Sequence, residues 1–111
     1  MNIADFRVEP ADYHADMDDL RAVREAVLEI DPKESENRVF DVLDPESSHF
    51  IARDNQHQAI GLGRLTPNQA IDLMGVLPTW RGKGVGKALL LALIDKARKL
   101  GWTEAKLNAP T

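Results

Sequence analysis

The sequence predicts one α/β domain built on a mixed, mainly antiparallel sheet with flanking helices. Three observations support this class. Short apolar stretches with strand-like patterns are interspersed with longer stretches of helical periodicity. One apolar strand runs through a glycine-rich loop directly into a helix, which is typical of α/β folds. The 111 residues contain no repeat and no linker, so we expect a single domain over residues 1–111.

The chain should begin with a strand and a helix. The strand is predicted over residues 3–9, where apolar residues alternate weakly before Pro10. The helix should begin at Asp16, a residue type that caps helix N-termini, and end at Asp31-Pro32. Residues 33–43 can hold a short second helix. The buried face of the first helix is predicted from apolar residues at helical spacing, namely Leu20, Val23, Val27 and Ile30.

The centre of the chain predicts an antiparallel hairpin and a further strand. Residues 49–53 and 58–65 read as two strands joined by a turn at 54–57. After another turn, residues 70–77 form the next strand. Their near-continuous apolar character predicts burial on both faces of the sheet.

The C-terminal third predicts a long amphipathic helix and a last strand. The helix should cover residues 85–100 and end at Gly101, which suits the position just after a helix. Residues 104–109 are then predicted as a strand. The buried stripe of this helix is expected to comprise Val85, Leu89, Leu93, Ala97 and Leu100.

Composition excludes several classes of protein. Hydrophobic residues make up 43% and charged residues 29%, which is usual for a folded globular chain. The absence of cysteine excludes disulfides and thiolate metal sites, and the three histidines, expected in surface or turn roles, lack ligand spacing, so we expect no metal. A net charge of −4 argues against nucleic acid, and no segment predicts a signal peptide or membrane span. A cytoplasmic location without membrane partners is expected.

The stretch from Pro78 to Lys87 has the features of a phosphate-binding loop. Its glycines permit positive φ angles and close approach of a ligand, and the following helix start offers free amides and a positive dipole end. A Walker A loop does not fit, because Arg81 occupies its first glycine position and Ala88 its hydroxyl position. A dinucleotide fingerprint fits poorly, because Lys87 stands in place of its third glycine. The basic C-terminal third favours a small anionic ligand.

A third loop type, Arg-x-x-Gly-x-Gly after an apolar strand, is matched fully by residues 81–86. With this motif the sequence resembles the GNAT superfamily of N-acetyltransferases, in particular its small bacterial members. The segment MGVLPTWRGKGVGKALL is similar to the family's central motif, and the hairpin HFIARDNQHQAIGLGRL lies in a family-like position. The resemblance covers nearly the whole chain. It implies acetyl-CoA as a co-substrate and an N-acetyltransferase activity.

The resemblance also implies a set of coenzyme-binding residues. Backbone amides of the loop should hold the pyrophosphate, and backbone groups of Met74 and Val76 should bind pantetheine. The Met74 amide is also placed to polarise the acetyl carbonyl, and Gly75 is expected to allow a bulge. The side chains of Met74 and Val76 are expected to pack in the core. The implied loop residues are Arg81, Gly82, Lys83, Gly84, Val85, Gly86 and Lys87.

The implied reaction is attack of a primary amine on the thioester, which a general base would assist. Many relatives carry a glutamate where this chain has Ala70, and Asp72 lies two residues on, on the same strand face. Asp72 is therefore the candidate base, with the alternative that it reaches solvent or an arginine. Trp80 is expected to pack under the loop. The acids of the first helix are expected to be solvated, or to favour a cationic acceptor.

Relatives continue past the last predicted strand with a further helix, which often carries a tyrosine acid, and two more strands. The chain ends at Thr111 without them, so the resemblance implies a C-terminally shortened member, or one whose sheet is completed by a partner. A homodimer through the open edge strand is expected. The acceptor is a small-molecule or peptide amine of unknown identity. Two alternatives stay open: a non-catalytic CoA-binding or dimerising relative, and a nucleotide-binding protein.

Overall fold

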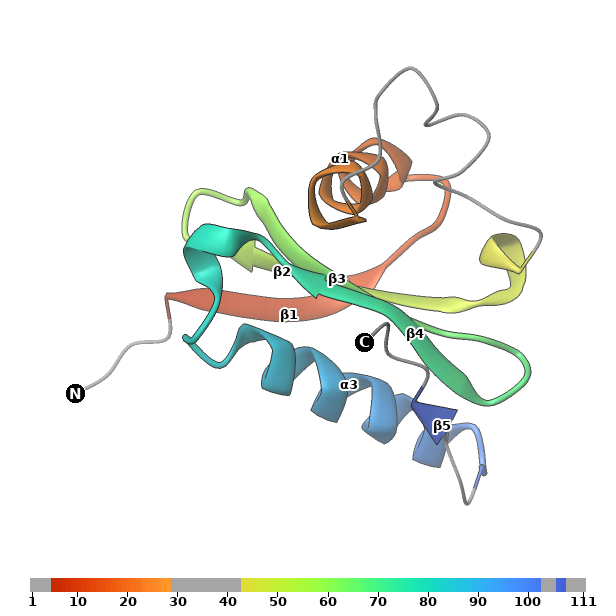
Figure 1. The fold of residues 1–111 in the computed structure, drawn as a ribbon. Helices are drawn as coiled ribbons and strands as arrows, with labels where there is room; N and C mark the ends of the chain where they lie inside the picture. The colour runs from red at the N-terminus through yellow and green to blue at the C-terminus, as the bar shows by residue number, and fades with distance from the viewer. Residues whose placement is uncertain (1–4, 29–42, 103–105, 108–111) are drawn as a thin grey trace.

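The computed structural model describes residues 5–28, 43–102 and 106–107. A five-stranded sheet has the strand order β1-β2-β3-β4-β5, antiparallel up to β4, with β5 parallel to β4. Helix α1 covers one face of the sheet and helix α3 the other, which confirms the predicted class (Figure 1). Within the part of the chain described, no helix is long and apolar enough to cross a membrane. The elements are β1 (Phe6–Ala11), α1 (Met17–Leu28), the 3-10 turn η1 (Asp44–Glu46), β2 (Ser48–Asp54), β3 (Ala59–Leu65), β4 (Ala70–Val76), the 3-10 turn η2 (Pro78–Trp80), α3 (Val85–Lys99) and β5 (Lys106–Leu107).

Strand β1 lies further along the chain than predicted. It runs from Phe6 through Pro10 to Ala11, so the proline is within the strand and does not end it. Proline lacks an amide hydrogen, and an edge strand tolerates this because one side of it makes no ladder bonds. Ile3 lies outside the described residues, as do Ile30, the predicted second helix at 33–43 and the predicted strand residues 104, 105, 108 and 109.

Helix α1 packs on the sheet through the predicted apolar face. Leu20 and Val23 are buried against Ile51 and Leu62, with Val27 beside them. The Leu20 amide donates to the Asp16 carbonyl, which places Asp16 at the helix start as predicted. The acids of this region are more than a solvated face, because Arg53 of β2 forms ion pairs with Glu9, Asp16 and Asp19 at 2.8, 3.3 and 2.9 Å. These pairs join β1, β2 and α1.

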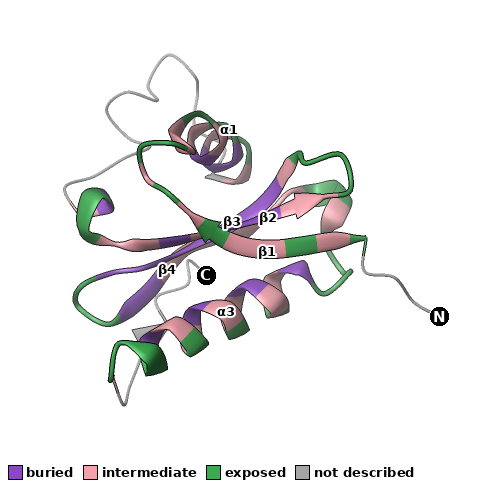
Figure 2. Cartoon of the chain, turned by 180° about the vertical axis from the view of Figure 1, so that it is seen from behind, coloured by how far each residue is buried: buried purple, intermediate pink, exposed green. Residues whose placement is uncertain are grey.

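Helix α3 buries four of its five predicted stripe residues, and Figure 2 shows the buried stripe facing the sheet. Leu100 was wrongly placed in this stripe and is 45% exposed. The reason is the helix end: Gly101 turns the chain with a φ of 82°. Its amide donates to the Arg98 carbonyl and the Trp102 amide to the Ala97 carbonyl, both at 3.0 Å, which is the Schellman pattern. Leu100 is the capping residue after the last residue of α3, so it lies beyond the buried stripe that ends at Ala97.

The prediction that β4 is buried on both faces holds only at its start. Ala70 and Ile71 are buried, whereas the five residues from Asp72 to Val76 are half-exposed. In the described part of the chain, β5 pairs with β4 only at Ala70 and Ile71, and no other described strand lies along residues 72–76 on that side. This stretch is the open edge of β4. The apolar run therefore reflects packing on two helices, with no described strand on that side of its second half.

Gly75 allows α1 to approach β4 closely. A Cβ atom built on Gly75 would lie 1.9 Å from Val27 Cγ1, well inside contact distance. The lack of a side chain at this position is therefore a packing requirement between helix and sheet.

We expect Gly75→Ala to destabilise the fold by about 1–3 kcal/mol, because α1 must move away from β4 to relieve the overlap. Denaturant unfolding monitored by circular dichroism measures the change. Gly86→Ala is the matched control, because its nearest neighbour, Val76 Cγ2, would lie 3.8 Å from the new Cβ. Equal stability of the two variants would contradict the packing role of Gly75.

Candidate active site

A β-bulge interrupts β4 beside the open edge. The register pairs Leu62 with Gly75 and Arg64 with Asp72, so Leu73 and Met74 lie opposite the single residue Gly63. Leu73 has a φ of 50°, a left-handed conformation that leucine rarely adopts. The bulge thus precedes Gly75, the position at which it was expected. A bulge takes backbone groups out of the ladder, and backbone strain of this kind concentrates at functional sites.

The side chain of Met74 is a core residue, as expected from its apolar surroundings. It packs beside buried residues of β2, β3 and α3. A Cβ on Gly63 would lie 3.1 Å from Met74 Cγ, so the strand opposite the bulge is also closely packed. Val76 packs in the same way, and its carbonyl accepts a hydrogen bond from Arg81 Nε at 3.2 Å. The Met74 side chain thus serves the core, and its backbone is the part expected to contact a ligand at the bulge.

The loop between β4 and α3 presents an open backbone. Gly82 and Gly84 have φ angles of 78° and 86°, and an added Cβ would meet nothing within 4 Å at either position. Glycine is thus required there by the backbone conformation. Gly84 caps α3, and its carbonyl accepts the first helical bond from Ala88. The amide groups of Val85, Gly86 and Lys87 lie in the first turn of α3. Backbone N–H groups in a first turn have no acceptor within the helix.

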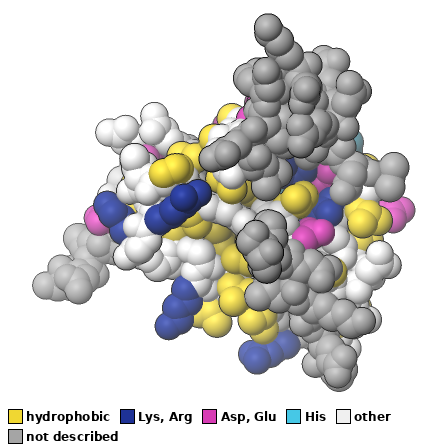
Figure 3. All heavy atoms as spheres, in the orientation of Figure 1, with side chains coloured by type: hydrophobic (Ala, Val, Ile, Leu, Met, Phe, Trp, Pro, Cys, Tyr) yellow, Lys and Arg dark blue, Asp and Glu magenta, His cyan; other side chains and the backbone are white. Residues whose placement is uncertain are grey.

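Positive charge surrounds this helix start. Arg81, Lys83 and Lys87 are all exposed, and Lys and Arg side chains stand out on the face that carries β4 and α3 (Figure 3). The Lys83 ammonium lies 5.1 Å from the centre of the Trp80 ring, which in turn packs edge-on against Phe6. Trp80 therefore lies under the loop as predicted. Free amides, a helix dipole and three cations are together the features that favour an anion at a helix start.

A cluster of charged and polar side chains, the charge cluster, extends from α1 to β4 and ends next to the bulge. Its members are Arg24, Asp44, His49, Arg64 and Asp72. At its centre, the fully buried Asp44 accepts hydrogen bonds from Arg24 at 2.9 and 3.1 Å and from Arg64 at 3.2 Å. Arg64 also donates from Nε and Nη2 to both oxygens of Asp72, each at 2.8 Å. The cluster thereby links α1 and η1 to β4 immediately before Leu73.

Asp72 lies at the outer end of this cluster, with 22% of its side chain exposed. Of the two expectations for it, contact with an arginine is observed. Its carboxylate is held in a bidentate, charge-assisted pair with Arg64. Its role as a base stays a prediction.

His49 was expected in a surface or turn role, and this was wrong. The ring is buried, stacks on Tyr13 and donates from Nε2 to the Asp44 carbonyl at 2.8 Å. Burial lowers the pKa of His49, and this effect outweighs the opposing influence of the Asp44 carbonyl. The ring is thus held neutral among the arginines. His14 and His57 are exposed near turns, as expected, and the described residues contain no group of acidic and histidine side chains able to hold a metal.

Most of the charge cluster was missed at the sequence level. A signal was present in two places: Arg24 lies four residues after Leu20, on the buried stripe of the helix, and Arg64 interrupts an apolar strand. Asp44 and His49 carry no such signal, because a turn and a strand start tolerate polar residues on the surface. Their burial depends on partners 20 and 25 residues away in the sequence.

Comparisons with known proteins bear on the family and the fold. The sequence profile of the Acetyltransferase (GNAT) family matches residues 11–110. Curated protein sequences yielded no match. The chain is similar in structure to a ribosomal-protein-alanine N-acetyltransferase from Brucella melitensis biovar Abortus 2308, with a TM-score of 0.71 and 22% identity over 95% of this chain and 80% of that one.

Two further structures share the fold. A putative N-acetyltransferase from Lactobacillus plantarum has a TM-score of 0.73 and 22% identity, over 92% of this chain and 73% of that one. AAC(6')-Iy, in complex with the bisubstrate analog CoA-S-monomethyl-acetylneamine, has a TM-score of 0.68 and 18% identity, over 96% of this chain and 79% of that one. These structures share a mixed α/β fold with this chain. The chain belongs to the GNAT acetyltransferase family.

The buried neutral His49 should make stability dependent on pH. Because the unfolded chain protonates this ring near its ordinary pKa of 6.5 and the folded protein resists protonation, the free energy of unfolding should fall as pH drops through 6.5. His49→Gln should remove this component. Denaturant unfolding of both proteins between pH 5 and 8 measures it, and parallel stability curves would contradict a neutral buried ring.

Proposed function

We propose that the protein is an N-acetyltransferase that transfers the acetyl group of acetyl-CoA to a primary amine of a small molecule or peptide. Family membership supports acyl transfer, and the anion site at the start of α3 supports a phosphate-bearing donor. The observation that carries the proposal is that three features of such a site occur together in one continuous segment of the chain. The β4 bulge, the open strand edge and the cationic helix start follow one another between Leu73 and Lys87.

In this proposal the amides of residues 82–87 hold the pyrophosphate, while the side chains of Arg81, Lys83 and Lys87 neutralise it. Glycine at positions 82 and 84 leaves the approach open, because no side chain stands over the loop backbone. Pantetheine would extend along the open edge of β4, hydrogen-bonded to backbone groups of Met74, Gly75 and Val76. AAC(6')-Iy, which shares the fold, has been solved with a CoA-containing bisubstrate analog.

The proposed reaction joins the amine nitrogen to the acetyl carbon as the carbon–sulfur bond breaks and the CoA thiolate departs. The Met74 amide, which lies in the bulge, would donate to the carbonyl oxygen as negative charge develops on it. Asp72, two residues earlier on the strand, would take a proton from the amine, directly or through water. Arg64 fixes the direction of its carboxylate.

Binding of acetyl-CoA tests the donor site. We expect one site per chain by calorimetry, and a loss of affinity of about tenfold or more for Arg81→Ala or Lys87→Ala, since each removes a charge-assisted contact to phosphate. Arg98→Ala, an exposed cation at the other end of the same helix, is the matched control and should bind normally. Absence of binding to a folded protein, or an equal loss in all three variants, would contradict the assignment.

Turnover tests Asp72. Release of free CoA is first measured against a panel of amino acids, aminoglycosides, polyamines and peptides. With an accepted amine, Asp72→Asn should lower kcat/KM by about 10²–10⁴-fold, while acetyl-CoA affinity is retained. Asp18→Asn, an exposed acid in the first turn of α1, is the control. An unchanged kcat/KM in Asp72→Asn would exclude Asp72 as the base.

A further inference from the structure

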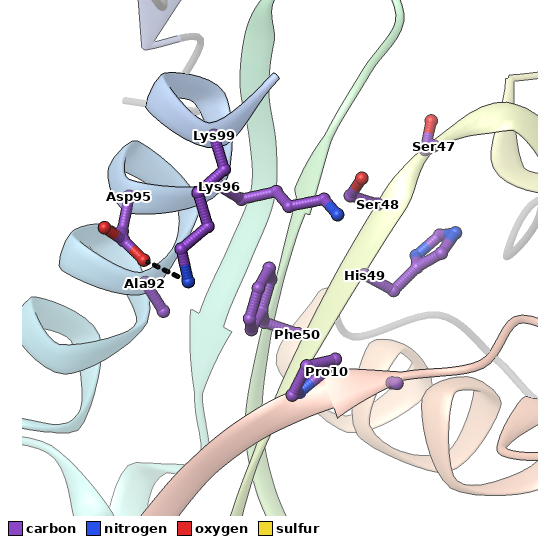
Figure 4. A pocket seen from close by; sticks show the side chains of 10 residues that line it. Pro10, Ser47, Ser48, His49, Phe50, Ala92, Asp95, Lys96 and Lys99 are labelled. Atoms are coloured by element: carbon purple, nitrogen blue, oxygen red, sulfur yellow. Dashed lines mark ion pairs between the residues drawn. The ribbon is translucent and has the colours of Figure 1, made fainter. Parts of the chain in front are cut away.

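A cavity of about 430 Å³ lies between the C-terminal half of α3 and the strands β1 and β2. Pro10 contributes from β1, Ser48 and Phe50 from β2, and Ala92 and Lys96 from α3 (Figure 4). Cavities of about 300–1,000 Å³ are the size that small-molecule sites have. Lys96 follows Val85 by eleven residues, so the cavity lies about 16 Å along α3 from the glycine-rich loop. It is therefore separate from the proposed coenzyme site.

The charges around this cavity are unbalanced. Lys99 is neutralised by Asp95, with 3.0 Å between Nζ and Oδ2. Lys96 instead extends across the cavity towards the hydroxyl of Ser48 (Figure 4). Its ammonium forms no ion pair with any residue that the structure describes. One positive charge and one hydroxyl are thus available at the same side of the cavity.

The remaining walls are apolar. The Phe50 ring lies below the Lys96 ammonium, with Pro10 and Ala92 beside it (Figure 4). His49 points away from the cavity, because successive side chains of a strand point to opposite faces of the sheet. The charge cluster therefore supplies no counter-ion to Lys96. The cavity combines a single cationic donor with a hydrocarbon surface.

We propose that this cavity binds a small monocarboxylate with an apolar or aromatic body. The carboxylate would accept hydrogen bonds from Lys96 and Ser48, and the body would lie against Phe50 and Pro10. A single negative charge matches the single unpaired ammonium. A phosphate would bring a second charge to an apolar wall without a partner, which is unfavourable, and a cation would be repelled by Lys96. The site is independent of the proposed acetyl transfer.

Benzoate and its neutral analogue benzamide are suitable probes, because they share a ring and differ in charge. Titration of the 111-residue chain, followed by amide shifts in ¹H–¹⁵N NMR spectra, should give saturable shifts at Ser48 and Phe50 with benzoate. Benzamide should bind at least tenfold more weakly, because it cannot pair with the ammonium. Equal binding of both probes, or no saturable shift at β2 with benzoate, would overturn the proposal.

Two lysine variants complete the test. Lys96→Met should weaken benzoate binding at least tenfold while keeping the length and packing of the side chain. Lys99→Met is matched in chemistry and helix position, but its ammonium is already paired, so it should change affinity less than twofold. Circular dichroism and acetyl-CoA binding of both variants show that the fold and the loop are intact. Equal losses in both variants would show general surface attraction and overturn the assigned site.

Discussion

The carboxylate of Asp44 is fully buried between two arginines, and the positions of three elements depend on it. It accepts hydrogen bonds from Arg24 of α1 and Arg64 of β3, and Arg64 also donates to Asp72 of β4. Removal of the Asp44 carboxylate would take from both buried arginines an acceptor that they share, and loss of one member of a buried charge pair costs several kcal/mol. The sheet, the first helix and the turn before β2 are therefore fixed relative to one another by directional bonds as well as by apolar packing.

This constraint matters most for β4, because this strand packs in the core and also forms the open edge of the described sheet. Its first two residues are buried between neighbouring strands, and Gly75 further along lets α1 come close. Between these points the chain inserts an extra residue and places Leu73 in a left-handed conformation. Such strain persists only where surrounding contacts determine the backbone. The Arg64–Asp72 pair on one side and the Gly75–Val27 contact on the other supply those contacts.

The two ends of helix α3 suit two different kinds of ligand. Its first turn has free amides and exposed cations, which suit a highly charged anion. Its last turns carry Lys96 over an apolar wall, which suits a weakly charged ligand with a hydrocarbon body. The buried stripe of the helix, from Val85 to Ala97, is continuous between these two ends. The same helix can therefore present both surfaces at a fixed separation without contact between their ligands.

Local patterns in the sequence determined the order of elements, the hairpin, the glycine-rich loop and the end of α3 at Gly101. Each of these depends on residues a few positions apart: side-chain periodicity, turn chemistry, or the left-handed conformation that glycine permits. The tertiary structure decided the place of the bulge, the exposure of Leu100, the burial of His49 and the pairing of Asp72. These depend on register between strands and on partners distant in the sequence, and the energy of a buried charge is set by such partners and not by its neighbours along the chain.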